Sequence, residues 1–206
     1  MRIYIKRGFT LIELLVVIGI IVIISALMLA NTNKFGGQSQ LQNLAYDIAL
    51  SVREAQVYGI SVQGSAGNFN VGYGMHFDTN TKMAYNLFAD TAQIGVYHVG
   101  EDVRPSPFAI GQGFYISKLC VTPTSGYEFC TGSSPTSVSQ LDILFIRPEP
   151  DAYISINNTH LTFDGNGNVV GGSLYSQARI VVTSPRGDFM SVVIWSNGQI
   201  TVNNNH

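Results

Sequence analysis

Cysteine is scarce in this sequence. Only Cys120 and Cys130 occur among the 206 residues, with no Cys-x-x-Cys pair and no histidine close to them. One pair at this spacing does not supply the ligands of a structural zinc site, and it lacks the short spacing of a catalytic dithiol. Disulfides persist in exported proteins, so we expect these two cysteines to be joined if this part of the chain leaves the cytoplasm. Closing a loop of about ten residues would contribute on the order of 2–3 kcal/mol.

Histidine is also rare, and the motifs of common enzyme classes are missing. The four histidines are scattered along the chain, as His76, His98, His160 and His206. The sequence contains no Walker phosphate loop, no HExxH zinc motif and no motif of a Ser-His-Asp triad. A catalytic or metal site would need several histidines to meet a carboxylate in the fold. We therefore expect no enzyme activity and no cofactor, with structural or solvated roles for the histidines.

Basic residues are few after the first eight positions. The chain has 11 Lys and Arg against 13 Asp and Glu, and three of the basic residues are Arg2, Lys6 and Arg7. The eight that remain leave residues 9–206 with a side-chain charge of −5. A nucleic-acid-binding domain usually carries a clustered basic surface. Nucleic acid is therefore not indicated as a partner.

The basic leader is followed by a long apolar run. Phe9 to Ala30 is 22 residues long, and only Thr10, Glu13 and Ser25 interrupt its apolar character. A helix of this length crosses a hydrocarbon core of roughly 30 Å. By the positive-inside rule, the leader stays in the cytoplasm and the residues after the run are exported. The run predicts a single-pass inner-membrane helix, with the lipid bilayer as its first partner.

The carboxylate of Glu13 needs an explanation, because an acid at the centre of a membrane helix costs about 2.5–3.5 kcal/mol. Three interpretations compete. A secretory signal has a shorter apolar core and a small-x-small cleavage site. A plain membrane anchor fits the length but gives no reason for Glu13. In the third interpretation, cleavage after Gly8 frees the amine of Phe9, and this positive charge, or that of a neighbouring chain, offsets the cost of the carboxylate.

The stretch Lys6-Arg7-Gly8-Phe9-Thr10-Leu11-Ile12-Glu13 resembles the N-terminal signature of type IV pilins and type II secretion pseudopilins. The resemblance implies that prepilin peptidase cuts between Gly8 and Phe9 and that Phe9 becomes N-methylated. It also implies that Glu13 pairs with the N-terminus of an adjacent subunit during assembly. Many major pilins have a helix-kinking proline where this chain has Ala30. That departure favours a minor pilin or a pseudopilin.

An amphipathic segment continues the helix beyond the membrane span. Between Gln40 and Tyr58, apolar residues recur at i, i+3, i+4 and i+7, and this spacing predicts a helix that docks onto a sheet. The polar segment 31–40 contains Gly36 and Gly37, so we expect it to bend or fray. The segment Leu44–Ala55 also resembles the H-type minor pseudopilins of type II secretion and related minor pilins.

After residue 59 the sequence predicts β structure, because short β-branched and aromatic runs alternate with turn residues and long helical periodicity is absent. Asp78–Thr81 predicts a hairpin turn, and Ser196-Asn197-Gly198 predicts a type I′ turn. The expected strands cover residues 71–77, 82–88, 94–99, 114–121, 141–146, 153–156, 160–163, 180–183, 190–195 and 199–202.

The predicted fold class is α+β. A long N-terminal helix, whose first half spans the membrane, packs on an antiparallel β domain with two sheets in a sandwich. Four segments are expected in chain order. They are a cleaved leader (1–8), a transmembrane and filament-core helix (9–30), its amphipathic continuation (31–59) and an exported β-rich domain (60–206).

Two further patterns suggest binding sites only weakly. Asp164, Asn166 and Asn168 alternate like the first ligands of an EF-hand calcium loop, but Val169 and Tyr175 replace the loop glycine and the closing glutamate. A tight turn between strands is the favoured interpretation, with calcium as a minor option, so no metal site is expected. A group of aromatic residues is assigned to core packing rather than to a sugar- or DNA-stacking platform: Tyr85, Phe88, Tyr97, Phe108, Phe114 and Tyr115.

These features predict a structural filament subunit. We expect it to wait in the inner membrane with its N-terminus in the cytoplasm, and then to join an extracellular type IV pilus or a periplasmic filament like that of type II secretion. The expected partners are prepilin peptidase, other pilin subunits and the inner-membrane assembly platform. The alternative is a minor pilin whose β domain is an adhesin or a DNA- or cargo-binding module at the filament tip. A membrane-anchored enzyme has no support in the sequence.

Overall fold

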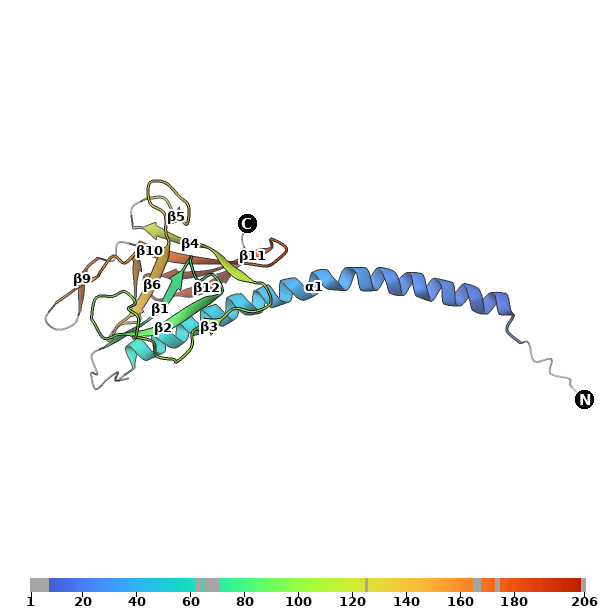
Figure 1. Ribbon diagram of the computed structural model, residues 1–206, viewed down its shortest axis with the longest axis horizontal. Helices are drawn as coiled ribbons and strands as arrows, with labels where there is room; N and C mark the ends of the chain where they lie inside the picture. Colours follow the sequence, from blue (N-terminus) through green and yellow to red (C-terminus); the bar gives the residue numbers. More distant parts are fainter. Residues whose placement is uncertain are drawn as a thin grey trace, which may run out of the picture. The chain divides into compact units, whose positions relative to one another are not determined.

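The computed structural model describes residues 8–61, 64, 71–124, 126–164, 168–172 and 175–204. These residues form one long helix, α1 (Leu11–Ile60), followed by β strands (Figure 1). The strands are β1 (Gly72–Asp78), β2 (Ala84–Asp90), β3 (Phe108–Ala109), β4 (Tyr115–Pro123), β5 (Phe129–Cys130), β6 (Gln140–Phe145), β7 (Ala152–Ile156), β8 (Thr162–Phe163), β9 (Val169–Gly171), β10 (Tyr175–Thr183), β11 (Phe189–Trp195) and β12 (Ile200–Asn203). The chain divides into two compact units, residues 1–39 and 40–206.

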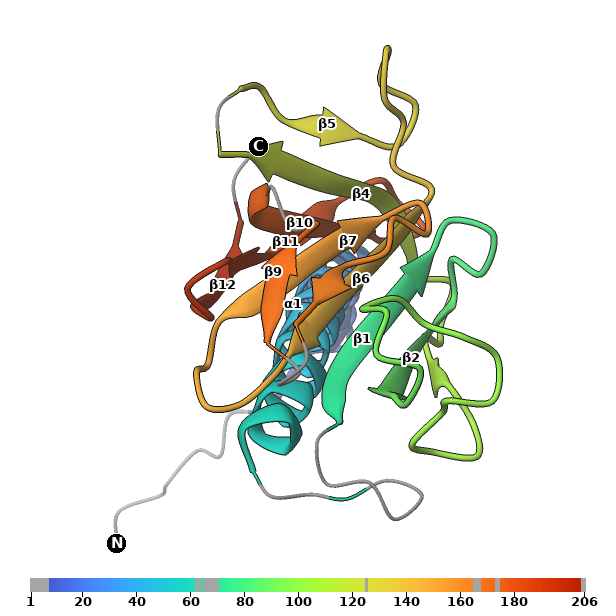
Figure 2. The same ribbon diagram turned by 90° about the vertical axis from the view of Figure 1, so that its left-hand side faces the viewer.

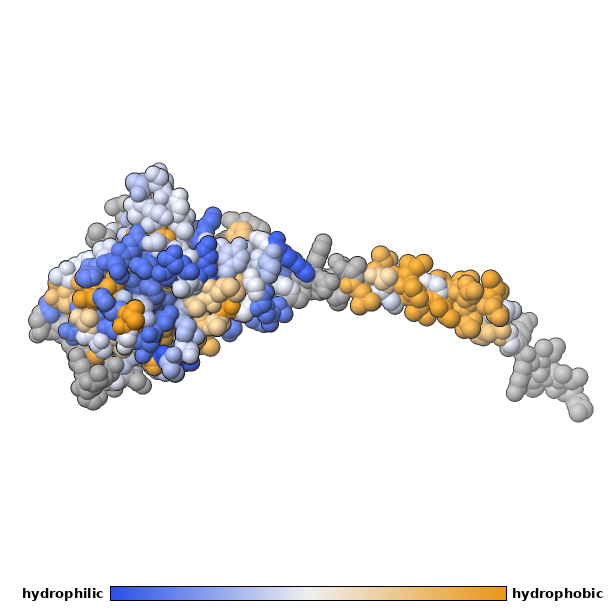
Figure 3. Space-filling view, in the orientation of Figure 1, coloured by the Kyte–Doolittle hydropathy of each residue, from blue (hydrophilic) through white to orange (hydrophobic). Residues whose placement is uncertain are grey.

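The first unit contains the apolar part of α1. Leu11–Leu29 is long and apolar enough to cross a membrane, given a rise of about 1.5 Å per residue and a hydrocarbon core of roughly 30 Å. None of its side chains is buried, and its large hydrophobic residues are between 45% exposed (Val17) and 81% exposed (Leu11). On the face drawn in Figure 3, this segment is mostly apolar. Such a surface requires lipid or protein to cover it, which fits membrane anchoring.

The backbone of α1 remains helical through residues 31–40. The fraying expected at Gly36 and Gly37 is not found. A glycine inside a helix costs only about 1 kcal/mol relative to alanine, so two of them weaken a helix without ending it.

The second unit is built around the C-terminal half of α1. Residues at alternating intervals of four and three are at most 1% exposed and form one stripe: Leu41, Ala45, Ile48, Val52 and Ala55. They pack in a single hydrophobic core with residues from both large sheets, as expected for the apolar face of an amphipathic helix. Near the end of the helix, a Cβ atom on Gly59 would come within 2.4 Å of the carbonyl oxygen of Phe145. The docking stripe predicted from the sequence is confirmed.

Two antiparallel five-stranded sheets share this core with α1 (Figure 2). Sheet 1 has the strand order β3-β2-β1-β6-β7, and sheet 2 has the order β12-β11-β10-β4-β5. Strands β8 and β9 form a separate two-stranded sheet. The predicted α+β class, with a helix and a sandwich-like pair of antiparallel sheets, is confirmed.

Sheet 1 is buried on both faces. Met75 and Phe77 of β1 belong to the main core, and His76 between them faces the other side because side chains alternate along a strand. On that outer side a second hydrophobic cluster forms around Phe88, Leu144 and Leu161. Residues from the segments that follow β2 and β7 therefore cover the face of the sheet that is turned away from α1.

Most strands lie where the sequence predicts them, including the β1–β2 hairpin around Asp78–Thr81. The prediction of a strand at residues 94–99 is wrong. The buried Asp90 carboxylate accepts hydrogen bonds from the N–H groups of Ile94 (3.0 Å) and Gly95 (2.9 Å), which folds this segment into a loop. Of the strand expected at 160–163, only β8 is extended, and it pairs with β9.

The β11–β12 turn at Ser196-Asn197-Gly198 differs from the predicted type I′ turn. A type I′ turn needs positive φ at two successive residues, whereas here Gly198 has a φ of +78° and Asn197 does not have a positive φ. The N–H of Gly198 donates to the carbonyl of Trp195 at 2.9 Å. This is the three-residue hairpin loop in which a left-handed glycine follows the turn.

Candidate processing and assembly site

Reciprocal hydrogen bonds between Thr10 and Glu13 close the first turn of α1. The backbone N–H of Glu13 donates to the Thr10 hydroxyl at 3.3 Å. Oε2 of Glu13 accepts from the backbone N–H of Thr10 at 3.2 Å and from its hydroxyl at 3.0 Å. This is a capping box, which satisfies N–H groups that have no partner at a helix start. The Thr-x-x-Glu pattern is visible in the sequence, and it gives Glu13 a local role besides the one that the family resemblance implies.

The Glu13 carboxylate is exposed and is only partly used by the capping box. Its Oε1 accepts no hydrogen bond from any residue that the structure describes. Gly8 and Phe9 precede the helix, and Phe9 is 83% exposed. A negative charge in the first turn is favoured by the partial positive charge of the helix N-terminus. The arrangement holds one carboxylate oxygen in place and leaves the other for a further donor.

The comparison with protein families identifies this segment. Residues 5–29 match the model of the prokaryotic N-terminal methylation motif. The chain carries a prepilin-type N-terminus. This prepilin-type N-terminus supports a pilin-like protein that prepilin peptidase processes, and it fits the use of Leu11–Leu29 as a membrane anchor that later enters a filament. No curated protein and no solved structure matches the chain.

The match covers the prepilin-type N-terminus and ends at residue 29. It does not reach Leu44–Ala55, so the resemblance of that segment to H-type minor pseudopilins stays a prediction. The cut between Gly8 and Phe9, the methylation of Phe9 and the pairing of Glu13 with a neighbour also stay predictions.

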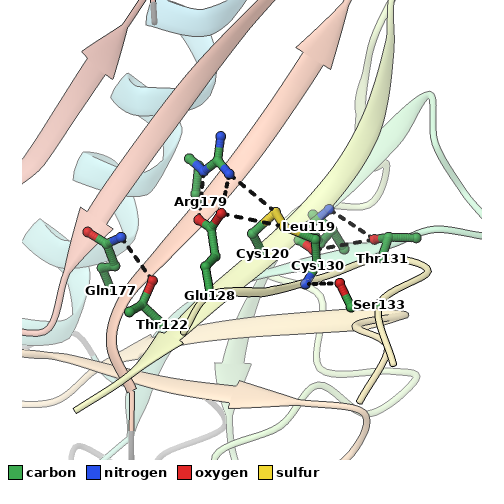
Figure 4. A network of polar contacts seen from close by, with 9 residues as sticks. All are labelled: Leu119, Cys120, Thr122, Glu128, Cys130, Thr131, Ser133, Gln177 and Arg179. Carbon is green, nitrogen blue, oxygen red and sulfur yellow. Dashed lines mark hydrogen bonds and ion pairs between the residues drawn. A yellow bond between two sulfur atoms is a disulfide. The ribbon is translucent and has the colours of Figure 1, made fainter. Parts of the chain in front are cut away.

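The two cysteines form the expected disulfide. Cys120 of β4 lies opposite Cys130 of β5, with the two Cα atoms 4.0 Å apart. Beside them, Glu128 forms an ion pair with Arg179 of β10 (Figure 4). The hydroxyl of Thr131 also bonds to backbone groups of neighbouring segments. The Glu128 carboxylate lies close to both sulfur atoms, but oxidised sulfur is not the thiolate that binds metals.

Two residues of the weak calcium candidate, Asp164 and Asn168, bond to each other. Oδ1 of Asp164 accepts from the backbone N–H of Asn168 at 2.8 Å, and Oδ2 accepts from the Asn168 side-chain amide at 3.0 Å. Asn166 lies outside the described residues. Both carboxylate oxygens of Asp164 therefore accept hydrogen bonds from Asn168, and the choice between a turn and a calcium site stays a prediction.

The histidines that the structure describes do not converge on one carboxylate. The rings of His98 and His160 are 6.5 Å apart, and His76 contacts Asp142 separately. His206 lies outside the described residues. Among the aromatic residues assigned to core packing, Tyr85, Phe88 and Phe114 are buried.

His76 belongs to a polar row that the sequence did not reveal. It lies opposite Asp142 of β6, which lies opposite Ser155 of β7. Nδ1 of His76 is 2.7 Å from Oδ1 of Asp142, and the imidazole stacks on Tyr97 with centroids 4.6 Å apart. A nucleophilic triad needs the histidine between serine and carboxylate, and here the carboxylate is in the middle. The Ser155 hydroxyl has no hydrogen-bond partner among the described residues, so the side-chain contact in this row is the one between His76 and Asp142.

Two arginines of the second unit are held by acidic partners. Arg104 lies 2.7 Å from Glu54 of α1 and stacks over the ring of Phe108 at 4.6 Å. Arg179 pairs with Glu128. Arginines that already bind carboxylates are poor ligands for a phosphate backbone, since binding would first have to break these pairs.

Proposed function

We propose that this chain is a structural subunit of a type IV pilus or a type II secretion-like filament, without enzyme activity. The observation that carries the proposal is the match of residues 5–29 to the N-terminal methylation motif, which includes the exposed apolar helical segment Leu11–Leu29. Prepilin peptidase cuts between Gly8 and Phe9, and Phe9 is then N-methylated. The apolar helix first lies in the bilayer, and during assembly it exchanges lipid contacts for contacts with neighbouring stems.

The chemistry of assembly centres on Glu13. Cleavage creates a positive amine on Phe9, and a carboxylate in a low-dielectric environment gains most from an opposite charge nearby. The capping box holds Oε2 of Glu13 through Thr10, while Oε1 accepts no hydrogen bond among the described residues. The amine of an adjacent subunit binds at Oε1. A pair of this kind sets the register between subunits more than it adds net stability.

The topology follows from the leader and from the disulfide. Arg2, Lys6 and Arg7 keep the N-terminus in the cytoplasm, so the chain crosses the inner membrane once and exports the segment 60–206. A disulfide between Cys120 and Cys130 suits an oxidising compartment. The division into leader (1–8), membrane and filament-core helix (9–30), amphipathic continuation (31–59) and exported domain is part of this proposal.

The subunit belongs to the minor pilins or pseudopilins in this proposal. Ala30 stands where many major pilins have a proline, and Leu44–Ala55 resembles the H-type minor pseudopilins. Its partners are prepilin peptidase, the inner-membrane assembly platform and other pilin subunits.

The test combines mass spectrometry with two variants. The mature protein should lack residues 1–8 and begin with N-methylated Phe9. Glu13→Ala should be cleaved normally but should enter filaments much less than the wild type. Glu13→Gln keeps one acceptor oxygen for the capping bonds from Thr10 but removes the charge, so it separates pairing from capping. It should also assemble poorly. Normal incorporation of both variants would falsify the role of Glu13, and an intact leader in the mature protein would remove the basis for the whole proposal.

A further inference from the structure

The second unit contains a cleft. It has a volume of about 430 Å³, within the range of small-molecule sites, about 300–1,000 Å³. We name it the β7–β9 cleft after two of the strands that contribute lining residues. The residues that matter for its chemistry are Asp151, Tyr153, Val170, Tyr175, Ser196 and Asn197.

The rim of the β7–β9 cleft is fixed by main-chain hydrogen bonds on both sides of Asp151. The carbonyl of Pro150 accepts from Nε2 of the buried Gln56 at 2.8 Å. The N–H of Ala152 donates to the carbonyl of Ser196 at 2.8 Å, and the N–H of Ser196 donates to the backbone carbonyl of Ser176 at 2.9 Å. The backbone of Asp151 is therefore held between two anchored residues, so its side chain starts from a fixed position at the rim of the cleft.

The polar groups of the cleft have unused hydrogen-bonding capacity. The Asp151 side chain has no hydrogen-bond partner and no ion pair within the described ranges. Oδ1 of Asn197 accepts from the N–H of Gln199 at 3.1 Å, so the turn orients the side chain while its amide group donates to no described residue. A carboxylate offers two acceptor oxygens and an amide offers two donors. This combination matches neighbouring hydroxyl groups, each of which donates and accepts.

Tyrosines supply the aromatic surface of the cleft. Tyr153 comes from β7 and Tyr175 begins β10, and both are half-buried. Burial raises the pKa of both phenols, and for Tyr153 the negative charges of Asp151 and Glu149 raise it further. The electron-rich face of an aromatic ring attracts polarised C–H groups, and its hydroxyl adds a polar handle. The exposed Val170 (64% exposed) forms an apolar wall.

The charge of the lining narrows the class of ligand. No Lys, Arg or His is among the described residues that line the cleft, while Asp151 contributes a carboxylate. Phosphates, uronic acids and nucleic acids would meet a negative surface without a counter-charge. We propose that the β7–β9 cleft binds a neutral saccharide, with its hydroxyl groups on Asp151 and Asn197 and its C–H faces on the tyrosines. This site goes beyond the proposed filament role and does not depend on it.

The experiment uses the full chain in lipid nanodiscs and isothermal titration calorimetry. The probes are the methyl glycosides of glucose, galactose and mannose, together with maltose, cellobiose and lactose. Glucuronic acid and glucosamine are the charged comparisons. At least one neutral probe should bind saturably, and glucuronic acid should not bind. The experiment measures binding by single chains. If no saccharide binds, the filament proposal is not affected, and if filaments do not assemble, the binding result is not affected.

Matched variants locate the binding. Val170→Arg should block the cleft and abolish binding, whereas Val99→Arg, which adds the same charge at a side chain that is 94% exposed outside the lining, should keep it. Asp151→Asn should lower affinity by about tenfold or more, the scale of a hydrogen bond to a charged group. Glu149→Gln removes the same charge outside the lining and should have little effect. The unfolding transition of each variant checks that it is folded.

Three results would overturn the proposal. The first is the absence of binding by every neutral probe. The second is binding by glucosamine alone, which would assign the cleft to cations. The third is equal affinity in Val170→Arg and Val99→Arg, which would place the binding elsewhere.

Discussion

Nδ1 of His76 lies 2.7 Å from Oδ1 of Asp142 on the outer face of sheet 1, beneath the segments that cover this face. Asp142 is fully buried, and its Oδ2 has no hydrogen-bond partner among the residues that the structure describes. A buried carboxylate that loses its partner keeps the cost of leaving water without the gain from pairing. The stability of the second unit should therefore depend strongly on this pair.

His76→Ala should destabilise the protein by about 3 kcal/mol, because it leaves Asp142 buried without its main donor. The measurement is urea unfolding of the full chain in detergent, monitored by circular dichroism. His98→Ala is the control at an exposed position and should change stability by less than about 0.5 kcal/mol. The double variant His76→Leu/Asp142→Leu should lose less than His76→Ala. Equal stability of wild type and His76→Ala would contradict the assignment.

Asp90 should make stability depend on pH. Burial raises the pKa of its carboxyl to about 6, although the N–H groups of Ile94 and Gly95 act in the opposite direction. Since the folded pKa lies above the ordinary value of 3.8, the stabilising contribution is present below about pH 4 and is lost as the pH rises through about 6. Asp90→Asn does not titrate, so its stability relative to wild type should rise by about 2–3 kcal/mol between pH 4 and pH 7. Urea unfolding at several pH values measures this difference, and a constant difference would rule the effect out.

Gly198 should tolerate no side chain. Its φ is +78°, and a Cβ atom there would lie 2.1 Å from the carbonyl oxygen of Pro150 and 2.5 Å from Nε2 of Gln56. Gly198→Ala should therefore cost about 3 kcal/mol or more, since a backbone clash adds to the left-handed penalty. Gly187 also has a positive φ, +92°, but a Cβ there meets nothing within 4 Å. Gly187→Ala should cost only about 1–2 kcal/mol. Thermal unfolding of both variants compares the two, and similar losses would count against the clash.

Thr10→Val should loosen the first turn of α1. Valine keeps the shape of threonine but removes the hydroxyl that bonds to Glu13, at a cost of about 1 kcal/mol for a lost N-cap. Hydrogen exchange of the Glu13 amide in detergent micelles should be faster in this variant. Thr10→Ser keeps a hydroxyl and should preserve protection. Unchanged exchange in Thr10→Val would show that the capping box does not hold the turn.

Sequence periodicity and turn residues predicted the buried helix stripe and the β1–β2 hairpin, because both depend on residues close together in the chain. The buried stripe of Leu41, Ala45, Ile48, Val52 and Ala55 follows from helical spacing, and the β1–β2 hairpin follows from a turn between two apolar runs. The loop at residues 94–99 did not follow, because its apolar pattern suits a strand while Asp90 binds its N–H groups.

The same distinction between local and non-local information applies to the sites. Gly8, Phe9 and Glu13 stand in one short motif that is readable in sequence order. The contact of His76 with Asp142 depends on the register of β1 against β6, and the β7–β9 cleft gathers residues from several separate segments. No single stretch of sequence contains either of them.

The buried stripe of α1 has a mechanical consequence. Leu41, Ala45, Ile48, Val52 and Ala55 lie in the common core of both sheets, so a pull along the helix is carried directly into that core. To extract the helix, that force must slide the whole stripe past both sheets, and its contacts must break together. A helix attached only at an edge would peel away one contact at a time. Under load this chain should unfold in shear, with a rate limited by the simultaneous loss of the core.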